Sequence, residues 1–248
     1  MTAALRGIWR HPIKALSREG LDRVTLSPGS ILPYDRHWAV THELSRPGDG
    51  WVAKRNFLRG VTGPQLMAVT AVLDEASERV TLRHPDKDAI TFAPEDPADT
   101  PGFLNWITPL WPEEQPRPTG IAALATGFTD VPEPWVAINN LATHRAVAGQ
   151  LEAPDLSAHR WRGNLWLDGF APWDEFDWTG RQIRIGDAVL EVRQRITRCK
   201  ATMANPETGH RDHDTLAALR HWGHQDFGIY AEVVQGGTVA LGDAAALL

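Results

Sequence analysis

Short stretches in which apolar and polar residues alternate recur along this chain of 248 residues. In residues 20–26, GLDRVTL, polar positions separate Leu21, Val24 and Leu26, and the turn sequence SPGS follows. A similar extended pattern resumes in residues 35–42, DRHWAVTH. Because alternation with a period of two is typical of a strand that buries one face, both segments are predicted to be strand-rich.

Further segments predict β-hairpins. Residues 67–74 and 79–85 flank the polar turn EASE and are expected to pair with each other. Residues 181–192, RQIRIGDAVLEV, turn at a Gly-Asp pair, and residues 227–243, FGIYAEVVQGGTVALGD, are predicted to form a closing hairpin around a Gly-Gly pair. Glycine-containing turns of this kind favour the tight backbone geometry that joins two antiparallel strands.

Apolar residues at helical spacing predict three helices. They cover residues 103–111, residues 139–151 with Asn139 or Asn140 as the capping residue, and residues 214–222. The predicted strands are short, numerous and separated by turn residues. We therefore predict a mainly β fold with a few helices (α+β) and a barrel-like architecture.

The composition narrows the class of protein. A formal net charge of −6 and a sequence pI of about 5.9 argue against a general nucleic-acid binder. No segment approaches the roughly 18 unbroken apolar residues that span a bilayer, so no membrane association is expected. The N-terminal residues lack the continuous apolar core of a signal peptide. One cysteine excludes an internal disulfide framework, and a reducing cytoplasm is the expected location.

The single cysteine, Cys199, lies in the sequence RITRCKATMANPETG. A lone cysteine is often a packed apolar residue. Here Arg195, Arg198 and Lys200 are close in sequence, and nearby cations favour the thiolate, which is the form that attacks or binds metal. On a strand, Arg198 and Lys200 would point away from the face of the sulfur, so Arg195 is expected to matter more.

Other catalytic patterns receive less support. The chain has no G-x-S-x-G elbow, no G-x-x-x-x-G-K-[ST] loop and no G-x-G-x-x-G loop after a strand. A Cys-His pair stays open because ten histidines are available, although none is favoured. A zinc site would use ligand types that zinc prefers, at an unfamiliar spacing; its ligands would come from Cys199, His210, His213, His221 and His224.

Several motifs occur in the order found in a known family. Near the N-terminus, HPIKAL is similar to the motif Y-P-[VI]-K-S-L, and YDRHWAV is similar to D-R-x-W. The segment from RWRGN through PWDEFDWTG is similar to R-x-R-P-N through P-W-x-E-x-x-W-x-G. The segment RCKATMANPETG is similar to R-C-x-x-T-x-x-D-P-x-T-G. The chain therefore resembles the MOSC proteins, together with the β-barrel domain that commonly precedes the MOSC domain. This resemblance implies a barrel-like N-terminal domain in residues 1–110 packed on a MOSC β-barrel domain in residues 111–248.

The resemblance also implies a molybdenum cofactor (molybdenum–molybdopterin) between the two β modules. The cysteine that ligates molybdenum in the family corresponds to Cys199, which is thus the expected metal ligand and catalytic residue. Molybdenum is soft enough to favour sulfur, and lysine and arginine suit the phosphate of the pterin. The residues expected to bind the cofactor are Lys14, Arg36, Arg162, Asn164, Asn139 and Asn140.

Three positions depart from the family motifs. Ala15 stands where a serine is usual, Gly163 replaces a proline, and Asn205 stands where an aspartate is common. A missing hydroxyl beside Lys14 removes one donor to a phosphate, and glycine in place of proline loosens a turn. These changes bear on the affinity for the cofactor and on the class of substrate.

Relatives such as the mitochondrial amidoxime reducing component imply an oxidoreductase that reduces small N-hydroxylated substrates. One cysteine cannot hold an iron–sulfur cluster, so a separate electron-transfer protein of the ferredoxin or cytochrome type is implied. Two alternatives stay open. One is a sulfur carrier or cofactor-handling protein that uses a Cys199 persulfide; some family members carry pyridoxal-phosphate-dependent desulfurases, for which this chain has no domain. The other is a non-catalytic barrel.

Overall fold

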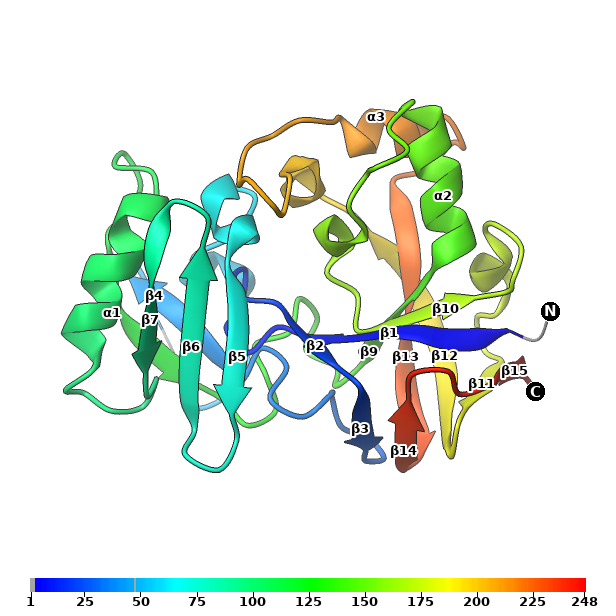
Figure 1. Ribbon diagram of the computed structural model, residues 1–248. Helices are drawn as coiled ribbons and strands as arrows, with labels where there is room; N and C mark the ends of the chain where they lie inside the picture. Colours follow the sequence, from blue (N-terminus) through cyan, green and yellow to red (C-terminus); the bar gives the residue numbers. More distant parts are fainter. Residues whose placement is uncertain (1–2, 47) are drawn as a thin grey trace.

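The computed structural model describes residues 3–46 and 48–248. Within these ranges the chain forms fifteen β-strands, three α-helices and several short 3-10 helices. Strands therefore dominate, and the mainly β fold with a few helices that the sequence predicts is confirmed. The elements form two lobes that lie side by side (Figure 1).

The larger lobe is built on one eight-stranded sheet. Neighbouring strands are antiparallel except for β9 and β10, which are parallel. In spatial order the strands are β15 (Ala245–Leu247), β11 (Gln182–Ile185), β12 (Ala188–Thr197), β13 (Asp226–Gln235), β9 (Val136–Asn140), β10 (Leu165–Asp168), β1 (Ala4–Arg10) and β2 (Glu19–Leu21). Aliphatic side chains from these strands alternate inward and form one continuous core, as period-two burial requires.

Helices cover part of this sheet (Figure 1). They are α2 (Leu141–Gln150) and α3 (Thr215–Arg220). Under them the indole of Trp161 stacks on the ring of Phe227 with 3.9 Å between centroids. Asn140 is the cap of α2, because its side chain accepts a hydrogen bond from the Ala142 backbone N–H, so the predicted helix and one of its two predicted caps are confirmed.

The smaller lobe contains a three-stranded and a two-stranded sheet with a helix beside them. The three-stranded sheet has the order β5 (Thr70–Asp74), β6 (Arg79–His84), β7 (Lys87–Phe92), and the two-stranded sheet pairs β4 (Trp38–His42) with β8 (Pro118–Ala123). Helix α1 (Thr100–Ile107) closes its core through Phe103 and Ile107. The predicted hairpin of β5 and β6 is confirmed.

One predicted hairpin is wrong. Strand β14 (Gly237–Ala240) follows β13 as expected, but it pairs with β3 (Arg23–Leu26) in a separate two-stranded sheet. Glycine permits this departure, since a Cβ at Gly237 would lie 2.6 Å from the carbonyl carbon of Asp187 in the β11–β12 turn. The backbone therefore crosses that turn instead of folding back along β13.

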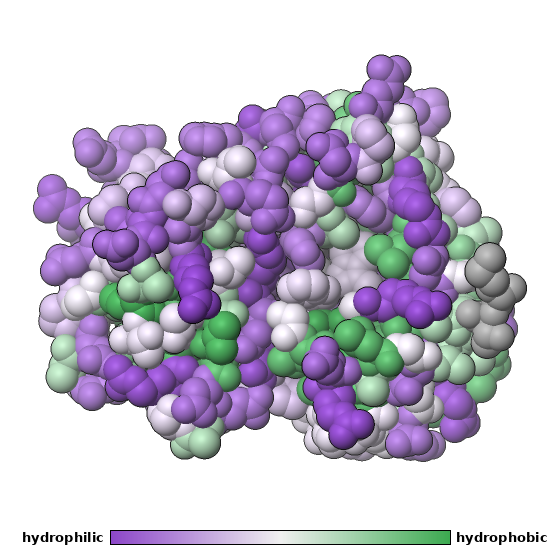
Figure 2. All heavy atoms as spheres, in the orientation of Figure 1, coloured by the Kyte–Doolittle hydropathy of each residue, from purple (hydrophilic) through white to green (hydrophobic). Residues whose placement is uncertain are grey.

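The chain crosses between the lobes more than once. Strands β1 and β2 belong to the sheet of the larger lobe, whereas β4 to β8 build the smaller one. The segments between β1 and β4 consequently run along the junction, where hydrophilic residues gather on the face shown in Figure 2. The predicted division of the chain at residue 110 stays a prediction.

In the described part of the chain, no helix combines the length and apolar character needed to cross a membrane.

Candidate functional site

A cavity of about 500 Å³ lies where the two lobes meet. Its lining comes from the loops after β1 and before β4, from residues 54–67, 129–137 and 160–164, and from the end of β12 with the residues that follow it. Five of the seven residues expected to bind the metal or the cofactor line it, namely Lys14, Arg36, Arg162, Asn164 and Cys199. The structure thus brings together most of the positions that the resemblance implies.

The cavity is strongly cationic although the whole chain is acidic. Among the described residues that line it, Asp130 is the single carboxylate. Clustered guanidinium and ammonium groups in a half-enclosed space attract anions far more than the same groups on an open surface. The cationic residues of the lining are Lys14, Lys54, Arg36, Arg59, Arg160, Arg162, Arg195 and Arg198.

Lys14 is buried at the base of this cavity, with 3% of its surface exposed. Its Nζ donates to the carbonyl oxygen of Phe128 at 2.7 Å and to Asp130 Oδ1 at 2.6 Å. Burial lowers the pKa of Lys14, although the Asp130 carboxylate opposes that shift. Burial alone would raise the pKa of Asp130, but Lys14 and Lys54 hold it well below its usual range. The ammonium of Lys14 is therefore held in place by a carboxylate before any ligand arrives.

Arg36 is held by a buried acid. Its Nη1 donates to Asp35, which also accepts the His11 backbone N–H at 2.7 Å, and its Nη2 donates to the Arg162 carbonyl at 3.2 Å. Burial, and then the charge of Arg162, lower the pKa of His11 to about 3, so this imidazole is neutral. The guanidinium of Arg36 is thus oriented by Asp35, which is buried and is not part of the cavity lining.

Arg162 lies beside Arg36. Its Nη2 donates to the Leu16 carbonyl at 3.0 Å, and no carboxylate is paired with it among the described residues. Burial, and then the charge of Arg36, lower the pKa of Arg162 to about 9. Two neighbouring cations with one buried counterion are an arrangement that a bound anion would stabilise.

Backbone strain concentrates at the same place. Three of the residues that line the cavity are non-glycine residues in the left-handed region, with φ values of 69° for Ala15, 56° for Arg36 and 51° for Arg162. Such a backbone costs free energy in L-residues and persists where surrounding contacts enforce it. Ala15, which replaces a usual serine of the motif, shows that this position is defined by its backbone as well as by its side chain.

Asn164 lines the cavity, but most of its hydrogen bonds join backbone segments of the fold. Its Oδ1 accepts the Ala137 backbone N–H at 3.1 Å, and its Nδ2 donates to the Trp9 carbonyl at 3.1 Å. The amide therefore ties β1 to β9, and 2% of the residue is exposed. One hydrogen on Nδ2 and one lone pair on Oδ1 are what it has left for a ligand.

Asn139 and Asn140 do not line the cavity. Asn140, besides capping α2, donates to Glu175 Oε2 at 2.9 Å on the far side of β9. Asn139 is fully buried behind Arg198, and a Cβ at Gly163 would lie 2.0 Å from its Nδ2. Gly163, which replaces the proline of the family motif, is therefore matched to the presence of Asn139.

Cys199 is exposed and lines the same cavity as Lys14. Strand β12 ends at Thr197, and Cys199 precedes the 3-10 helix η6 (Lys200–Met203), so the alternation expected for a strand does not apply to its neighbours. Arg198 lines the same cavity, with Nη1 donating to the Trp161 carbonyl at 2.7 Å. Burial lowers the pKa of Arg198 to about 10. Cys199 thus lines a cationic space and is accessible to solvent.

Sequence reasoning missed several residues of this site. Asp130, Lys54 and Tyr230 line the cavity, but they come from segments without a recognisable motif, and no local pattern could have found them. Asp35 carried a signal, since it opens the D-R-x-W motif. Only the fold shows that its carboxylate is buried against His11 and Arg36.

The histidines considered for zinc lie elsewhere. His224 packs edge-on against the rings of Trp173 and Phe176, with 5.1 Å between ring centroids in each case. Within the described ranges, His, Cys, Asp and Glu side chains do not gather in groups of three or more suited to a metal ion.

The chain is similar to several known proteins. It is 35% identical over 81 residues to the molybdenum cofactor sulfurase of Drosophila mojavensis, and 33% identical over 93 residues to that of Drosophila grimshawi. These matches cover 32% and 37% of this chain but only 10% and 12% of the relatives. Among solved structures, the YUAD protein from Bacillus subtilis covers 100% of this chain and 96% of its own, at 14% identity and a TM-score of 0.48.

Family models account for nearly the whole sequence. The MOSC N-terminal beta barrel domain matches residues 2–106, and the MOSC domain matches residues 129–246. The two-domain architecture expected from the motifs, an N-terminal barrel domain followed by a MOSC domain, is thereby confirmed. This chain belongs to the MOSC family, with a MOSC N-terminal beta barrel domain followed by a MOSC domain.

Proposed function

We propose that this protein is an oxidoreductase that binds the molybdenum cofactor and reduces small N-hydroxylated substrates. The observation that carries the proposal is the shared cavity, whose lining contains an exposed cysteine together with cations that the fold holds in place. A thiolate is a suitable ligand for a soft metal, and lysine and arginine suit a phosphate. The cavity therefore offers a thiolate ligand for molybdenum at the dithiolene end of the pterin and cationic partners for the phosphate at its other end.

The donor set fits this cofactor. Lys14, Arg36 and Arg162 would hold the phosphate, and Cys199 would complete the coordination of molybdenum. A volume of about 500 Å³ lies in the range of small-molecule sites. The two cations with a single buried counterion, Arg36 and Arg162, gain a partner when a dianion binds, which supports the assignment.

Molybdenum held here would supply two-electron redox chemistry at the N–O bond of the substrate. The protein would fix the cofactor at its phosphate end, keep the Cys199 sulfur as a ligand and leave the open side of the cavity for substrate. Since a lone cysteine cannot hold an iron–sulfur cluster, we also propose a separate ferredoxin- or cytochrome-type electron donor. A reducing cytoplasmic location would keep the single thiol reduced.

The test starts from protein produced in a host that makes the cofactor. We expect stoichiometric molybdenum by elemental analysis, bound molybdopterin by mass spectrometry and reduction of benzamidoxime with a supplied electron donor. Cys199→Ala should lose the reductase activity, whereas Lys200→Gln, which changes an exposed neighbour outside the cavity lining, should keep it. Full activity in Cys199→Ala would overturn the proposal.

A second candidate function is favoured by the names of the curated relatives, which are molybdenum cofactor sulfurases. In that case the accessible Cys199 sulfur would carry a persulfide received from a separate desulfurase and pass the outer sulfur on. Mass spectrometry of the intact protein separates the two functions. One extra sulfur atom on Cys199 supports the carrier, and bound molybdopterin with molybdenum supports the reductase.

A further inference from the structure

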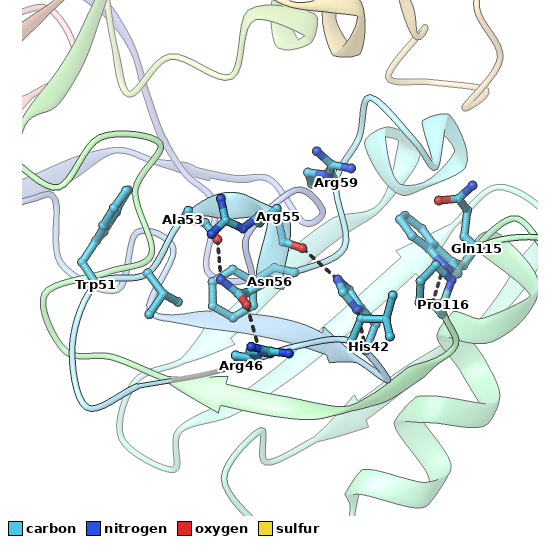
Figure 3. Close-up of a pocket in the computed structure, with 13 residues that line it drawn as sticks. His42, Arg46, Trp51, Ala53, Arg55, Asn56, Arg59, Gln115 and Pro116 are labelled. Atoms are coloured by element: carbon cyan, nitrogen blue, oxygen red, sulfur yellow. Dashed lines mark hydrogen bonds between the residues drawn. The ribbon is translucent and has the colours of Figure 1, made fainter.

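A second cavity, of about 670 Å³, lies in the smaller lobe. Figure 3 shows its walls, which come from the loop after β4, from the 3-10 helix η1 (Lys54–Asn56) and from residues 111–116. Nothing in the proposed function uses this space.

The polar groups at its base are already occupied by the fold. His42 Nε2 bonds to the Arg55 carbonyl at 3.0 Å, and His42 Nδ1 accepts the Leu44 backbone N–H at 3.2 Å. Asn56 accepts the Arg46 backbone N–H at 2.9 Å and donates to the Ala53 carbonyl at 3.0 Å (Figure 3). These bonds shape the loop and leave little hydrogen-bonding capacity for a ligand.

The groups that remain available are cationic. Arg46, Arg55 and Arg59 line the cavity, and among the described residues none of them forms an ion pair with a carboxylate. No aspartate or glutamate is part of the described lining. In a chain with more acidic than basic residues, three unpaired guanidinium groups around one hollow are unusual and favour an anionic ligand.

One tryptophan adds apolar surface. The Trp51 indole N–H donates to the Thr129 carbonyl at 3.0 Å, so the carbon surface of its half-buried ring is what it presents. Trp111 closes the cavity from below, since it is buried in the core of the smaller lobe and its indole N–H donates to the Pro116 carbonyl at 3.0 Å. A flat apolar body next to an anionic group would satisfy both parts of the lining.

This second cavity is distinct from the cavity between the two lobes, which the proposed function makes the cofactor cavity. The two cavities nevertheless border each other. Lys54 lines the cofactor cavity, whereas the next residue, Arg55, lines the second one. Arg59 lines both. The three-residue helix η1 therefore separates two cationic cavities, and a ligand in one cavity would lie across this helix from a ligand in the other.

We propose that the cavity of the smaller lobe is a second anion-binding site, which takes a small aromatic carboxylate or phosphate ester. The guanidinium groups of Arg46, Arg55 and Arg59 hold the anionic group, and the ring lies against the carbons of Trp51. The volume falls in the range of small-ligand pockets. Binding at this site requires neither molybdenum nor Cys199.

Calorimetric titration of the full chain with benzoate, phenyl phosphate and inorganic phosphate tests the proposal. We expect benzoate and phenyl phosphate to bind, and phenyl phosphate to bind more tightly than inorganic phosphate because of its ring. Arg46→Gln with Arg55→Gln should weaken benzoate binding by about tenfold or more, since two charged donors are lost. A control with the same change in charge on exposed residues elsewhere, Arg184→Gln with Arg220→Gln, should bind like the wild type.

A third variant, Lys14→Gln, separates the two cavities. Loss of benzoate binding in Lys14→Gln but not in the Arg46/Arg55 variant would place the probe in the cofactor cavity and overturn this proposal, without harming the proposed function. Equal affinity in the Arg46/Arg55 variant and its control, or no binding to the wild type, would also overturn it. As an independent readout, benzoate should shift the indole N–H resonance of Trp51, assigned with Trp51→Phe.

Discussion

In the cavity between the two lobes, the wall that carries Lys14 and Arg36 is largely buried and ion-paired, whereas the wall that carries Cys199 is exposed to solvent. On the first wall, Asp35 and Asp130 neutralise cations that the fold has removed from water. On the second, an exposed thiol precedes a short 3-10 helix. Changes to the first wall should therefore alter both folding and binding, and changes to the second should alter chemistry alone.

The largest effect on stability is expected at Asp35. Asp35→Ala removes the buried partner of Arg36 and the acceptor of the His11 N–H, and it leaves a largely buried cation unpaired. We expect a loss of about 3–5 kcal/mol in the free energy of unfolding, measured by urea denaturation at neutral pH. Asp88→Ala, at an exposed carboxylate, is the control and should change little. A loss at Asp35 no larger than at Asp88 would contradict the description of this wall.

A smaller effect should follow from the pH. The pKa of His11 is lowered to about 3 in the folded chain, mainly by burial, whereas an unfolded histidine titrates near 6.5. Its contribution to stability is therefore complete above about pH 6.5 and is lost as the pH falls toward the folded pKa. Between about pH 6 and pH 5, His11 should account for about 1 kcal/mol of the loss.

Urea denaturation across that range, compared between the wild type and His11→Gln, isolates this contribution. The variant is expected to be less stable at neutral pH and to show a flatter dependence on pH. If both proteins lost stability in parallel, the burial of a neutral His11 would have no role in the pH dependence.

Asp130 is half-exposed, and its carboxylate competes with any bound anion for the ammonium of Lys14. Asp130→Asn should raise the affinity for inorganic phosphate several-fold, since the competing negative charge is gone. Stability should fall by about 1 kcal/mol, because the buried Lys14 ammonium loses its charged partner while an amide at position 130 keeps an acceptor oxygen. Calorimetric titration measures the affinity, with Lys14→Gln as the matched variant that lacks the cation. Weaker phosphate binding in Asp130→Asn would show that the carboxylate positions Lys14 more than it competes.

The smallest effect on folding is expected at Cys199. Cys199→Ser changes an exposed side chain, so thermal unfolding should shift by less than the equivalent of about 0.5 kcal/mol. The native wild-type protein should react with iodoacetamide at this residue, and the variant should not. If Cys199 reacted only after denaturation, the solvent exposure of this residue in the folded protein would be contradicted.

Much of the fold was accessible from the sequence because it depends on local periodicity. Alternation predicted β5 and β6 as a hairpin, and an asparagine before an apolar run predicted the cap of α2. The hairpin predicted for β13 and β14 failed, because the partner of β14 is β3, more than two hundred residues away in sequence. Strand pairing between distant segments has no local signature.

For the candidate site, the motif residues could be named from the sequence, since motif order and residue type are properties of the chain. Lys14, Arg36, Arg162 and Cys199 were all named in this way. Only the tertiary structure decided that they share one cavity, that Asn140 faces away from it, and that Asp130 lies among the cations. The physical reason is that burial and electrostatic pairing depend on distances in space, which the crossing of the chain between two lobes sets.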